Sequence, residues 1–417
     1  MRVAIIGGGA AGCFAAISVK RRCPEAEVTV YESDEKLLSK VAVTGGGRCN
    51  LTNSFAKVKS IESVYPRGAR LMKRLLMQFS HEDTFRWFES EGVRLVVQED
   101  CCVFPKSQNA MEIVDTLVSL MRGLGVCVKT GHRLRRLVRA DEGNGSVGSE
   151  GNFKLVFSEN GDYCRHADKV LVAMGGIPKL KGFSFLDGIG LEIVSPVPSL
   201  FGLCLPNQAI TEMTGTVVND VSVSIRGTKL RAEGPLLITH WGMSGPAILR
   251  LSSYGARFLA ESEYKADIAV NWFGESSESE VAEQLARLSS ANLQKQLSSV
   301  YPNRFNSRLW QHLLQRCGLR PEQRWAELGS KSRNKMVATM TNDIYHVDGK
   351  NRFKEEFVTC GGVSLRSVSQ STLEAKACPG LYFAGEVLDV DAVTGGFNLQ
   401  AAWTMGEVAA SNLVDSL

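Results

Sequence analysis

The first 32 residues alternate between apolar runs and polar breaks in a way that predicts a strand, a helix and a second strand. Residues 2–6 (RVAII) and 27–31 (EVTVY) are short apolar runs with β-branched side chains. Residues 13–22 between them have the composition of a buried helix, which Pro24 ends. A glycine-rich turn at residues 7–12 (GGGAAG) joins the first strand to the helix. The pattern is typical of a β-α-β unit with parallel strands.

The glycines of this turn have the spacing of a dinucleotide-binding site. Gly7, Gly9 and Gly12 fit G-x-G-x-x-G, and Glu32 ends the second strand 20 residues after Gly12. Gly7 permits the sharp turn, a bare position 9 lets the backbone approach a pyrophosphate, and Gly12 lets the helix pack on the sheet. Because the Glu32 carboxylate would bind ribose hydroxyls and repel a 2′-phosphate, we predict FAD or NAD rather than NADP. Residues 143–148 match the same spacing without a flanking strand or helix, so we interpret them as a loop.

Four later segments place glycines where the backbone could approach the same ligand. Residues 44–53 (TGGGRCNLTN) contain three consecutive glycines, which form neither a stable helix nor a stable strand, and Arg48 adds a fixed positive charge. Residues 169–176 (KVLVAMGG) and 380–386 (GLYFAGE) read as buried strands that end in glycine. Residues 394–400 (TGGFNLQ) precede an alanine-rich helix, whose amino terminus suits an anion or a polar ring edge.

The middle of the chain has a different character. From residue 182 onward the segments are short and punctuated by proline, and residues 217–225 (VVNDVSVSI) alternate like an antiparallel strand. Residues 275–335 are polar and helical in pattern. In the first part of the chain, residues 69–92 have apolar positions at helical spacing and predict one amphipathic helix. A second dinucleotide fingerprint with its strand and helix is absent from residues 182–356, which argues against a separate nicotinamide domain.

Composition limits the possible classes. A chain of 417 residues is too long for one compact core, and 44% hydrophobic with 22% charged residues is ordinary for a soluble protein. The apolar runs are too short to span a membrane, and a first strand at Arg2 leaves no room for a signal peptide. The eleven cysteines show neither C-x-x-C nor metal-ligand spacing, so we predict no metal and a reducing cytoplasm. A net charge of +4, without a lysine or arginine block, permits a nucleic-acid partner but does not argue for one.

Taken together, these motifs resemble those of the BaiN/RdsA (YhiN-type) flavoproteins, over nearly the whole chain. The segments that carry the resemblance are residues 7–12 with Glu32, 45–53 (GGGRCNLTN), 103–107 (VFPKS), 239–247 (THWGMSGPA) and 359–403, which contains TCGGVSL and GEVLDVDAVTGGFNLQ. The resemblance implies FAD as the resident cofactor. It also implies an α/β fold with three parts: a Rossmann-like FAD-binding domain of glutathione-reductase type from residues 1–181 and 357–417, an inserted β-barrel-like domain from 182–274 and 336–356, and a helical subdomain at 275–335.

The resemblance also assigns the cofactor contacts by matched motif. Asp389 follows the last strand, where its carboxylate suits the hydroxyls of a flavin ribityl chain. The sequence departs from the family at Met174, where a threonine is usual, at Ala392, where a glycine is usual, and in a compressed segment after Gly176. The predicted cofactor-binding residues are Gly7, Gly9, Ala10, Ala11, Gly12, Glu32, Lys40, Thr44, Gly46, Gly47, Arg48, Cys49, Asn50, Leu134, Ala173, Gly175, Gly176, Gly385, Glu386, Asp389, Gly395, Gly396, Phe397, Asn398 and Leu399.

The reaction has three alternatives at this point. The first is reduction of a polarised carbon–carbon double bond with electrons from NAD(P)H. For this reaction the resemblance implies a uracil of 23S ribosomal RNA, giving dihydrouridine, or a bile-acid-like enone as substrate. The second is oxidation of a small amine such as aminoacetone, with oxygen as the final acceptor. The third is a non-catalytic FAD-bearing protein that binds RNA or acts in assembly. The sequence leaves the oligomeric state open.

Two residues are candidates for catalysis. Cys49 lies in the flavin-side motif beside Arg48, whose charge would favour a thiolate, so Cys49 is our candidate proton donor. The alternative is that Cys49 is a small buried residue that packs under the ring. His240 could face the substrate, although a lone histidine is more often a structural group.

Overall fold

The structure, a computed structural model, describes residues 1–139, 152–158, 163–351 and 358–415. The chain forms two compact units. The first combines Met1–Pro198 with Val358–Leu417, and the second is Ser199–Phe357. The loop that we predicted at residues 143–148 and the predicted boundary near residue 357 lie outside the described residues. The division of the second unit into a β-rich part and a helical part remains a prediction.

The first unit is built on a parallel sheet of five strands in the order β19-β10-β1-β2-β6. The central strand β1 pairs with β10 on one side and β2 on the other, so that Ile6 lies opposite Val172 and Tyr31. All five carboxyl ends therefore meet at one edge of the sheet, where α/β proteins bind their ligands. The strands are β1 (Arg2–Ile6), β2 (Glu27–Tyr31), β6 (Cys127–Lys129), β10 (Lys169–Val172) and β19 (Leu381–Phe383).

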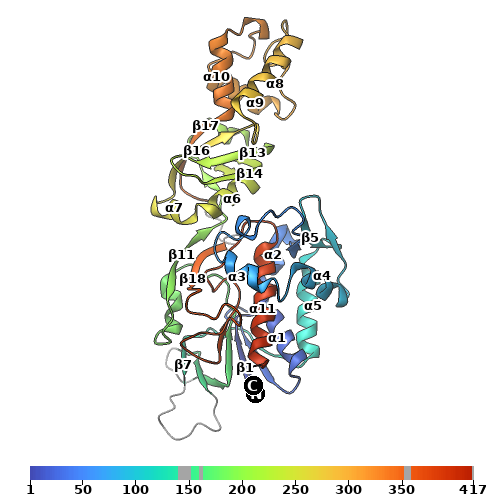
Figure 1. The fold of residues 1–417 in the computed structure, drawn as a ribbon, viewed down its shortest axis with the longest axis vertical. Helices are drawn as coiled ribbons and strands as arrows, with labels where there is room; N and C mark the ends of the chain where they lie inside the picture. Colours follow the sequence, from blue (N-terminus) through green and yellow to red (C-terminus); the bar gives the residue numbers. More distant parts are fainter. Residues whose placement is uncertain (140–151, 159–162, 352–357, 416–417) are drawn as a thin grey trace. The chain divides into compact units, whose positions relative to one another are not determined.

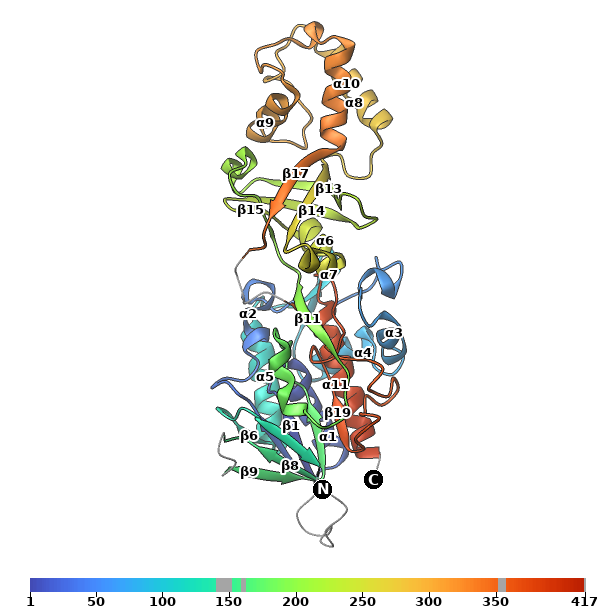
Figure 2. The ribbon, with the colours of Figure 1, turned by 90° about the vertical axis from the view of Figure 1, so that its left-hand side faces the viewer.

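Helices from both ends of the chain pack against this sheet (Figures 1 and 2). Helix α1 (Ala10–Arg22) contacts the C-terminal helix α11 (Phe397–Asp415), and α5 (Ala110–Gly123) contacts α1 and α2 (Ser39–Gly47). A Cβ on Gly406 would lie 2.7 Å from the carbonyl oxygen of Ala11, so α11 approaches α1 too closely for a side chain there. The smaller strands of this unit are β3 (Thr52–Asn53), β4 (Leu95–Val97), β5 (Cys102–Pro105), β7 (Arg136–Arg139), β8 (Phe153–Val156), β9 (Cys164–Ala167), β11 (Ile193–Ser199) and β18 (Val358–Val363).

The predicted single helix over residues 69–92 is wrong in one respect, because the structure divides it. Helix α3 (Ala69–Leu75) ends before a turn, and α4 (His81–Ser90) begins afresh. Ser80 caps α4: its hydroxyl accepts from the Asp83 N–H, and the Asp83 carboxylate accepts from the Ser80 N–H in return. The apolar spacing continues across this break, and periodicity alone therefore did not reveal it.

The second unit contains an antiparallel sheet of six strands in the order β12-β15-β14-β13-β16-β17. Its core is separate from that of the first unit and includes Trp272, Trp310 and Trp325, which are fully buried. The elements are β12 (Leu203–Cys204), β13 (Val217–Ile225), β14 (Arg231–Thr239), β15 (Gly242–Ser244), β16 (Lys265–Asn271), β17 (Asp343–Asp348), α6 (Pro246–Tyr254), α7 (Ala256–Glu261), α8 (Glu278–Ala291), α9 (Ser307–Cys317) and α10 (Ser330–Thr341).

Among the described residues, none of the helices is both long enough and apolar enough to cross a membrane. The same residues contain no group of three histidine, cysteine or acidic side chains placed to hold a metal ion.

Candidate functional site

The glycine turn after β1 owes its sequence to two different constraints. Gly7 has a φ of +108°, and a Cβ there would lie 2.7 Å from the carbonyl oxygen of Ala173. A Cβ on Gly12 would lie 1.9 Å from the carbonyl oxygen of Gly7. By contrast, a Cβ on Gly9 would meet no atom within 4 Å. Packing inside the protein thus requires Gly7 and Gly12, whereas Gly9 borders open space in front of the turn.

That space lies at the amino terminus of α1. Gly9 caps the helix without a side-chain hydrogen bond, and the first turn contains no acidic residue. The first N–H groups of an α-helix have no partner within the helix and carry its partial positive charge. The backbone at Ala10 and Ala11 therefore offers donors to an anion, as a pyrophosphate requires.

Glu32 lies at the end of β2 and closes the opposite side of the turn. Its carboxylate accepts hydrogen bonds from the Gly8 N–H (2.7 Å), the Asp34 N–H (2.9 Å) and the Ser33 hydroxyl (3.0 Å). These bonds fix the carboxylate beside the glycine turn. The carbonyl oxygen of Glu32 accepts from the His132 N–H (2.7 Å), which brings the segment after β6 to the same place.

Leu134 follows on that segment and is buried. A hollow of about 440 Å³ begins beside Glu32 and is lined by Ser33, Asp34, Glu35, Lys36 and Ser39. The arrangement suits the adenosine end of a dinucleotide, with the ribose at Glu32.

A second cluster forms where β10 and β19 end. The Ala173 N–H donates to the carbonyl oxygen of Ile6, which holds the Ala173–Gly176 turn against β1. The ammonium of Lys40 pairs with one carboxylate oxygen of Glu386 at 3.2 Å, and the other oxygen accepts from the Thr359 N–H at 2.7 Å.

Glycines make this close approach possible. A Cβ on Gly176 would lie 2.4 Å from the Glu386 carboxylate, and one on Gly175 would lie 3.3 Å from the Lys40 ammonium. Gly385 has a φ of +83°, and a Cβ there would lie 3.2 Å from the Cβ of Ala11. The structure thus brings the predicted residues Lys40, Gly175, Gly176, Gly385 and Glu386 to the sheet edge that contains the glycine turn.

The glycines of residues 44–47 expose backbone, as predicted. Within α2, Thr44, Gly45 and Gly46 have non-helical dihedral angles, which breaks the helix. A Cβ on Gly46 or Gly47 would meet no atom within 4 Å, and both residues are exposed. The Thr44 hydroxyl donates to the carbonyl oxygen of Lys40 within the same helix.

The loop that follows packs directly on residues 394–400. The Asn53 amide donates to the carbonyl oxygen of Gly395 at 2.9 Å. The Asn50 amide oxygen accepts from the Gly396 N–H at 3.2 Å, and its nitrogen donates to the carbonyl oxygen of Thr52. A Cβ on Gly396 would lie 2.2 Å from that same Thr52 oxygen, so position 396 accepts only glycine.

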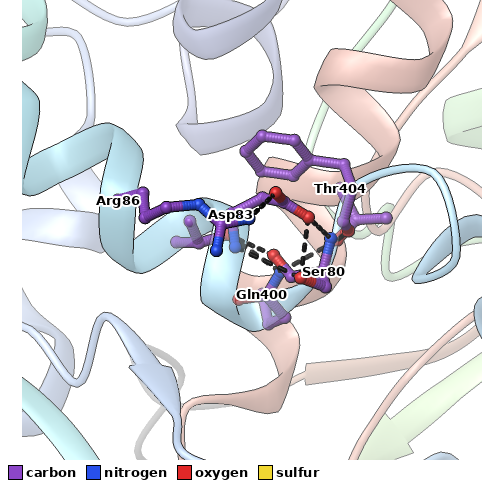
Figure 3. A network of polar contacts seen from close by, with 7 residues as sticks. Ser80, Asp83, Arg86, Gln400 and Thr404 are labelled. Carbon is purple, nitrogen blue, oxygen red and sulfur yellow. Dashed lines mark hydrogen bonds and ion pairs between the residues drawn. The ribbon is translucent and has the colours of Figure 1, made fainter.

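A buried polar network behind these two loops holds them together, and Figure 3 shows the part of it in which Gln400 meets Ser80 and Thr404. The Gln400 side-chain oxygen accepts from the Thr52 hydroxyl, and its nitrogen donates to the hydroxyls of Thr84 and Thr404 at 2.9 Å. The same nitrogen donates to the carbonyl oxygen of Ser80 at 3.2 Å, which joins α4 to α11. We did not predict a role for Gln400. In the sequence, only its place in the motif NLQ at residues 398–400 pointed to it.

Two predicted residues at the start of α11, Phe397 and Asn398, have structural partners. Both polar atoms of the Asn398 amide bond to the backbone of Ala392 at 2.9 Å. The ring of Phe397 is buried and packs edge-on against Phe55 at 5.2 Å. Leu399 is half-buried. Asp389, which we predicted at the ribityl chain, donates its N–H to the carbonyl oxygen of Val363. These contacts fix the shape of the loop, and the roles of its residues toward a flavin remain predictions.

The structure does not favour a Cys49 thiolate. Cys49 is fully buried, and burial raises the pKa of its thiol to about 12. The positive charge of Arg48, which we expected beside the Cys49 thiol, has other partners. The Arg48 guanidinium lies over the Phe104 ring at 4.4 Å and donates to the carbonyl oxygen of Gly45. The structure therefore favours the alternative, in which Cys49 packs as a small neutral residue.

His240, the other catalytic candidate, belongs to the second unit. It lies in the turn between β14 and β15 and is exposed. The ring of His240 forms no hydrogen bond within the described part of the chain. It therefore differs from the usual structural histidine, whose ring nitrogens are hydrogen-bonded within the protein.

Comparison with known proteins decides the family. The sequence model described as "HI0933-like protein Rossmann domain" matches residues 1–412. The chain belongs to the HI0933-like family. This result confirms the resemblance drawn from the motifs, and the parallel sheet confirms a Rossmann-type domain.

Two curated relatives match this HI0933-like chain along almost its whole length. A 3-dehydro-bile acid delta(4,6)-reductase of Clostridium scindens is 28% identical over 420 residues, which cover 98% of each chain. A ribosomal RNA dihydrouridine synthase of Escherichia coli K12 is 28% identical over 424 residues, 98% of this chain and 97% of that protein. Among solved structures, a 3-ketosteroid delta1-dehydrogenase of Sterolibacterium denitrificans has a TM-score of 0.51 at 12% identity and covers 100% of this chain and 99% of its own. At that identity it supports the fold alone.

The residues present fit FAD. Gly9 leaves open space at the α1 amino terminus, and the Glu32 carboxylate lies beside the same glycine turn, which is the arrangement that a dinucleotide requires. Together with the family, this fit makes the HI0933-like chain an FAD-dependent oxidoreductase.

Proposed function

We propose that this protein reduces an activated carbon–carbon double bond with electrons from NAD(P)H, and that a uracil of 23S ribosomal RNA is its leading substrate, giving dihydrouridine. The observation that carries the proposal is the full-length match to two relatives whose names both describe addition of hydrogen to a double bond. A double bond conjugated to a carbonyl accepts a hydride at the far carbon and a proton at the near one, and a uracil has such a bond.

FAD, when bound, would supply the ring that carries the hydride. The chain would hold its diphosphate at the α1 amino terminus and its ribose at Glu32. Gly46 and Gly47 expose bare backbone, and Gly395 and Gly396 form the facing loop, so we assign these two loops to the flavin side. Because residues 182–356 lack a second fingerprint, NAD(P)H is proposed to bind transiently rather than to reside in a domain of its own.

The proton that is added to the substrate should come from a group other than Cys49. A thiol whose pKa is about 12 gives up its proton poorly at neutral pH. His240 is exposed and its ring has no hydrogen-bond partner among the described residues, so it keeps the proton-donor role as a proposal. Replacing His240 with glutamine should slow the reduction of substrate while leaving the reduction of FAD by NAD(P)H unchanged.

The bile-acid relative supports a second candidate substrate, a small cyclic enone. It is as similar to this chain as the RNA enzyme is, so similarity does not separate the two. Both candidates share the bond that is reduced and differ in the size and charge of the molecule that carries it.

The test compares substrates directly. The FAD-loaded protein is mixed with NADH or NADPH and with either an unmodified 23S ribosomal RNA transcript or a steroid enone, and the RNA is digested to nucleosides for mass spectrometry. We expect dihydrouridine among the nucleosides of the treated transcript, and its loss from cellular RNA when the gene is deleted. Unchanged dihydrouridine after deletion would remove the RNA assignment. Rapid release of peroxide with an amine substrate would instead establish an oxidase.

A further inference from the structure

Residues 292–341, which we call the basic segment, have a surplus of positive charge. It contains nine lysines and arginines and two glutamates, a surplus of seven. The whole chain has a net charge of +4, so the remaining residues together have a net charge of −3. One stretch of the second unit thus carries more than the entire excess of positive charge.

The basic segment is a well-ordered scaffold. It comprises α9, α10 and the loops before and between them. The indole N–H of Trp310 donates to the carbonyl oxygen of Leu297, and that of Trp325 donates to the carbonyl oxygen of Val300. The two indole rings stack with centroids 6.3 Å apart. These buried contacts fix the loop backbone on which the charged side chains stand.

The fold gathers the cations at the end of α9. The Lys335 ammonium lies over Gly318, 3.4 Å from where a Cβ would be. Lys331 precedes Lys335 by one turn of α10 and shares its face. Arg320 follows Gly318 by two residues. Residues 293–298 form backbone hydrogen bonds with residues 321–326, which places Lys295 and Arg324 on neighbouring loop segments.

These charges lack local compensation. Lys295, Arg320, Lys331 and Lys335 are exposed, and their charged groups form no ion pair or hydrogen bond within the described part of the chain. Like charges at i and i+4 repel each other along a helix. Helix α8 shows the ordinary alternative, since its Arg287 pairs with Glu283 at 2.6 Å.

We propose that the basic segment binds the phosphate backbone of an RNA substrate. The inference rests on the proposed function. It adds an RNA-docking surface that is formed by residues far from the glycine turn in the sequence. Uncompensated lysines and arginines on an ordered surface bind phosphates with release of counterions. A lipid surface fits less well, because Leu293 is the one large hydrophobic side chain exposed among the described residues of the segment.

The experiment removes three charges at once. Arg320→Gln, Lys331→Gln and Lys335→Gln are combined in the full-length, FAD-loaded protein, and its affinity for a 23S ribosomal RNA transcript is measured by filter binding over a series of salt concentrations. The control carries Arg70→Gln, Lys73→Gln and Arg74→Gln, three exposed residues at α3 with the same total change in charge. FAD content and thermal unfolding are recorded for both proteins to show that each is folded.

We expect the basic-segment variant to bind RNA about tenfold more weakly, with a salt dependence lowered by about two in log–log slope. The control should retain the parental affinity. Equal affinity of parent and variant, equal weakening in the control, or failure of the parent to bind RNA would each overturn the proposal. So would binding to phosphatidylglycerol vesicles that the variant loses while its RNA affinity is unchanged.

The experiments can refute the docking surface and the proposed function independently of each other. If the protein reduces a steroid enone with NAD(P)H but does not bind RNA, the docking surface is wrong and the double-bond reductase stands. If RNA binds through the basic segment without formation of dihydrouridine, the docking surface stands and the RNA reaction is wrong.

Discussion

Glu32 is the residue on which binding of the adenosine end should depend. Replacing it with alanine removes the acceptor for the Gly8 N–H and the proposed acceptor for the ribose hydroxyls. Hydrogen bonds to a charged group contribute about 1.5–3 kcal/mol, so Glu32→Ala should weaken FAD binding about 10- to 100-fold. Flavin fluorescence during titration of the FAD-free protein measures this change. Glu27→Ala, an exposed residue at the opposite end of β2, serves as the control, and an unchanged affinity for FAD in Glu32→Ala would refute the role.

Cys49 should prove dispensable for chemistry. With FAD bound, Cys49→Ala should keep turnover within about threefold of the parent, because a thiol with a pKa of about 12 stays neutral in the assay. Its pKa in the fold lies above the unfolded value, so the stability that the neutral thiol contributes is present up to about pH 9 and lost as pH rises toward 12. The free energy of unfolding, measured at pH 7 and pH 10, should therefore fall less in Cys49→Ala than in the parent. A large loss of turnover would restore Cys49 as the proton donor.

The difference between these two residues shows what a sequence can specify. The position of Glu32 follows from local chain geometry, because a strand, a tight turn and a helix of fixed length determine where the next strand ends. The environment of Cys49 depends on distant residues, since Phe104 draws Arg48 away and the fold buries the thiol. Neighbours in sequence therefore did not indicate that the Cys49 thiol is buried.

At the scale of elements, the glycine turn allows a matched pair of substitutions. Gly12→Ala would place a Cβ 1.9 Å from the Gly7 oxygen, so we expect a loss of stability of about 3 kcal/mol. Gly9→Ala meets open space and should leave stability nearly unchanged while weakening FAD binding about tenfold or more, because the methyl group would occupy the proposed pyrophosphate site. Urea unfolding of the FAD-free proteins and FAD titration measure the two effects. Equal FAD affinity in Gly9→Ala and the parent would contradict the site.

The Gln400 network provides a test of how two loops are joined. Gln400→Ala leaves buried partners on Thr52, Thr84 and Thr404 without their hydrogen bonds, so the free energy of unfolding should fall by about 2–4 kcal/mol. Gln311→Ala, on the exposed side of α9, is the control and should fall by less than about 0.5 kcal/mol. Denaturant unfolding gives both values, and a loss in Gln400→Ala no larger than that in the control would contradict the network.

Elements were predictable where the signal was local. The strand–turn–helix at the start of the chain follows from hydrophobic pattern and glycine spacing, and the structure reproduces it as β1, α1 and β2. The break between α3 and α4 depends on one reciprocal cap at Ser80, which leaves the apolar spacing intact. The basic segment escaped notice for a related reason, because its cations are scattered in sequence and only the fold of α9 and α10 brings Lys331 and Lys335 beside Gly318.

For the whole molecule, the two separate cores predict two responses to the cofactor. FAD should bind to the first unit alone, so FAD at 100 times its dissociation constant should stabilise that unit by about 2.7 kcal/mol and leave the other unchanged. Calorimetry of the FAD-free protein should then show two transitions, of which added FAD raises one by about 5–10 °C. A single transition that moves as a whole would show that the units unfold together.

The contact between Ala11 and both Gly385 and Gly406 has a consequence for biosynthesis. The ribosome makes the glycine turn first and the elements that close over it last. Until β19 and α11 have been made, β10 lacks a neighbour on one side of the sheet and α1 lacks the helix that packs against it. A chain that lacks these elements lacks part of the proposed flavin site, so we expect FAD to bind only after β19 and α11 have been added.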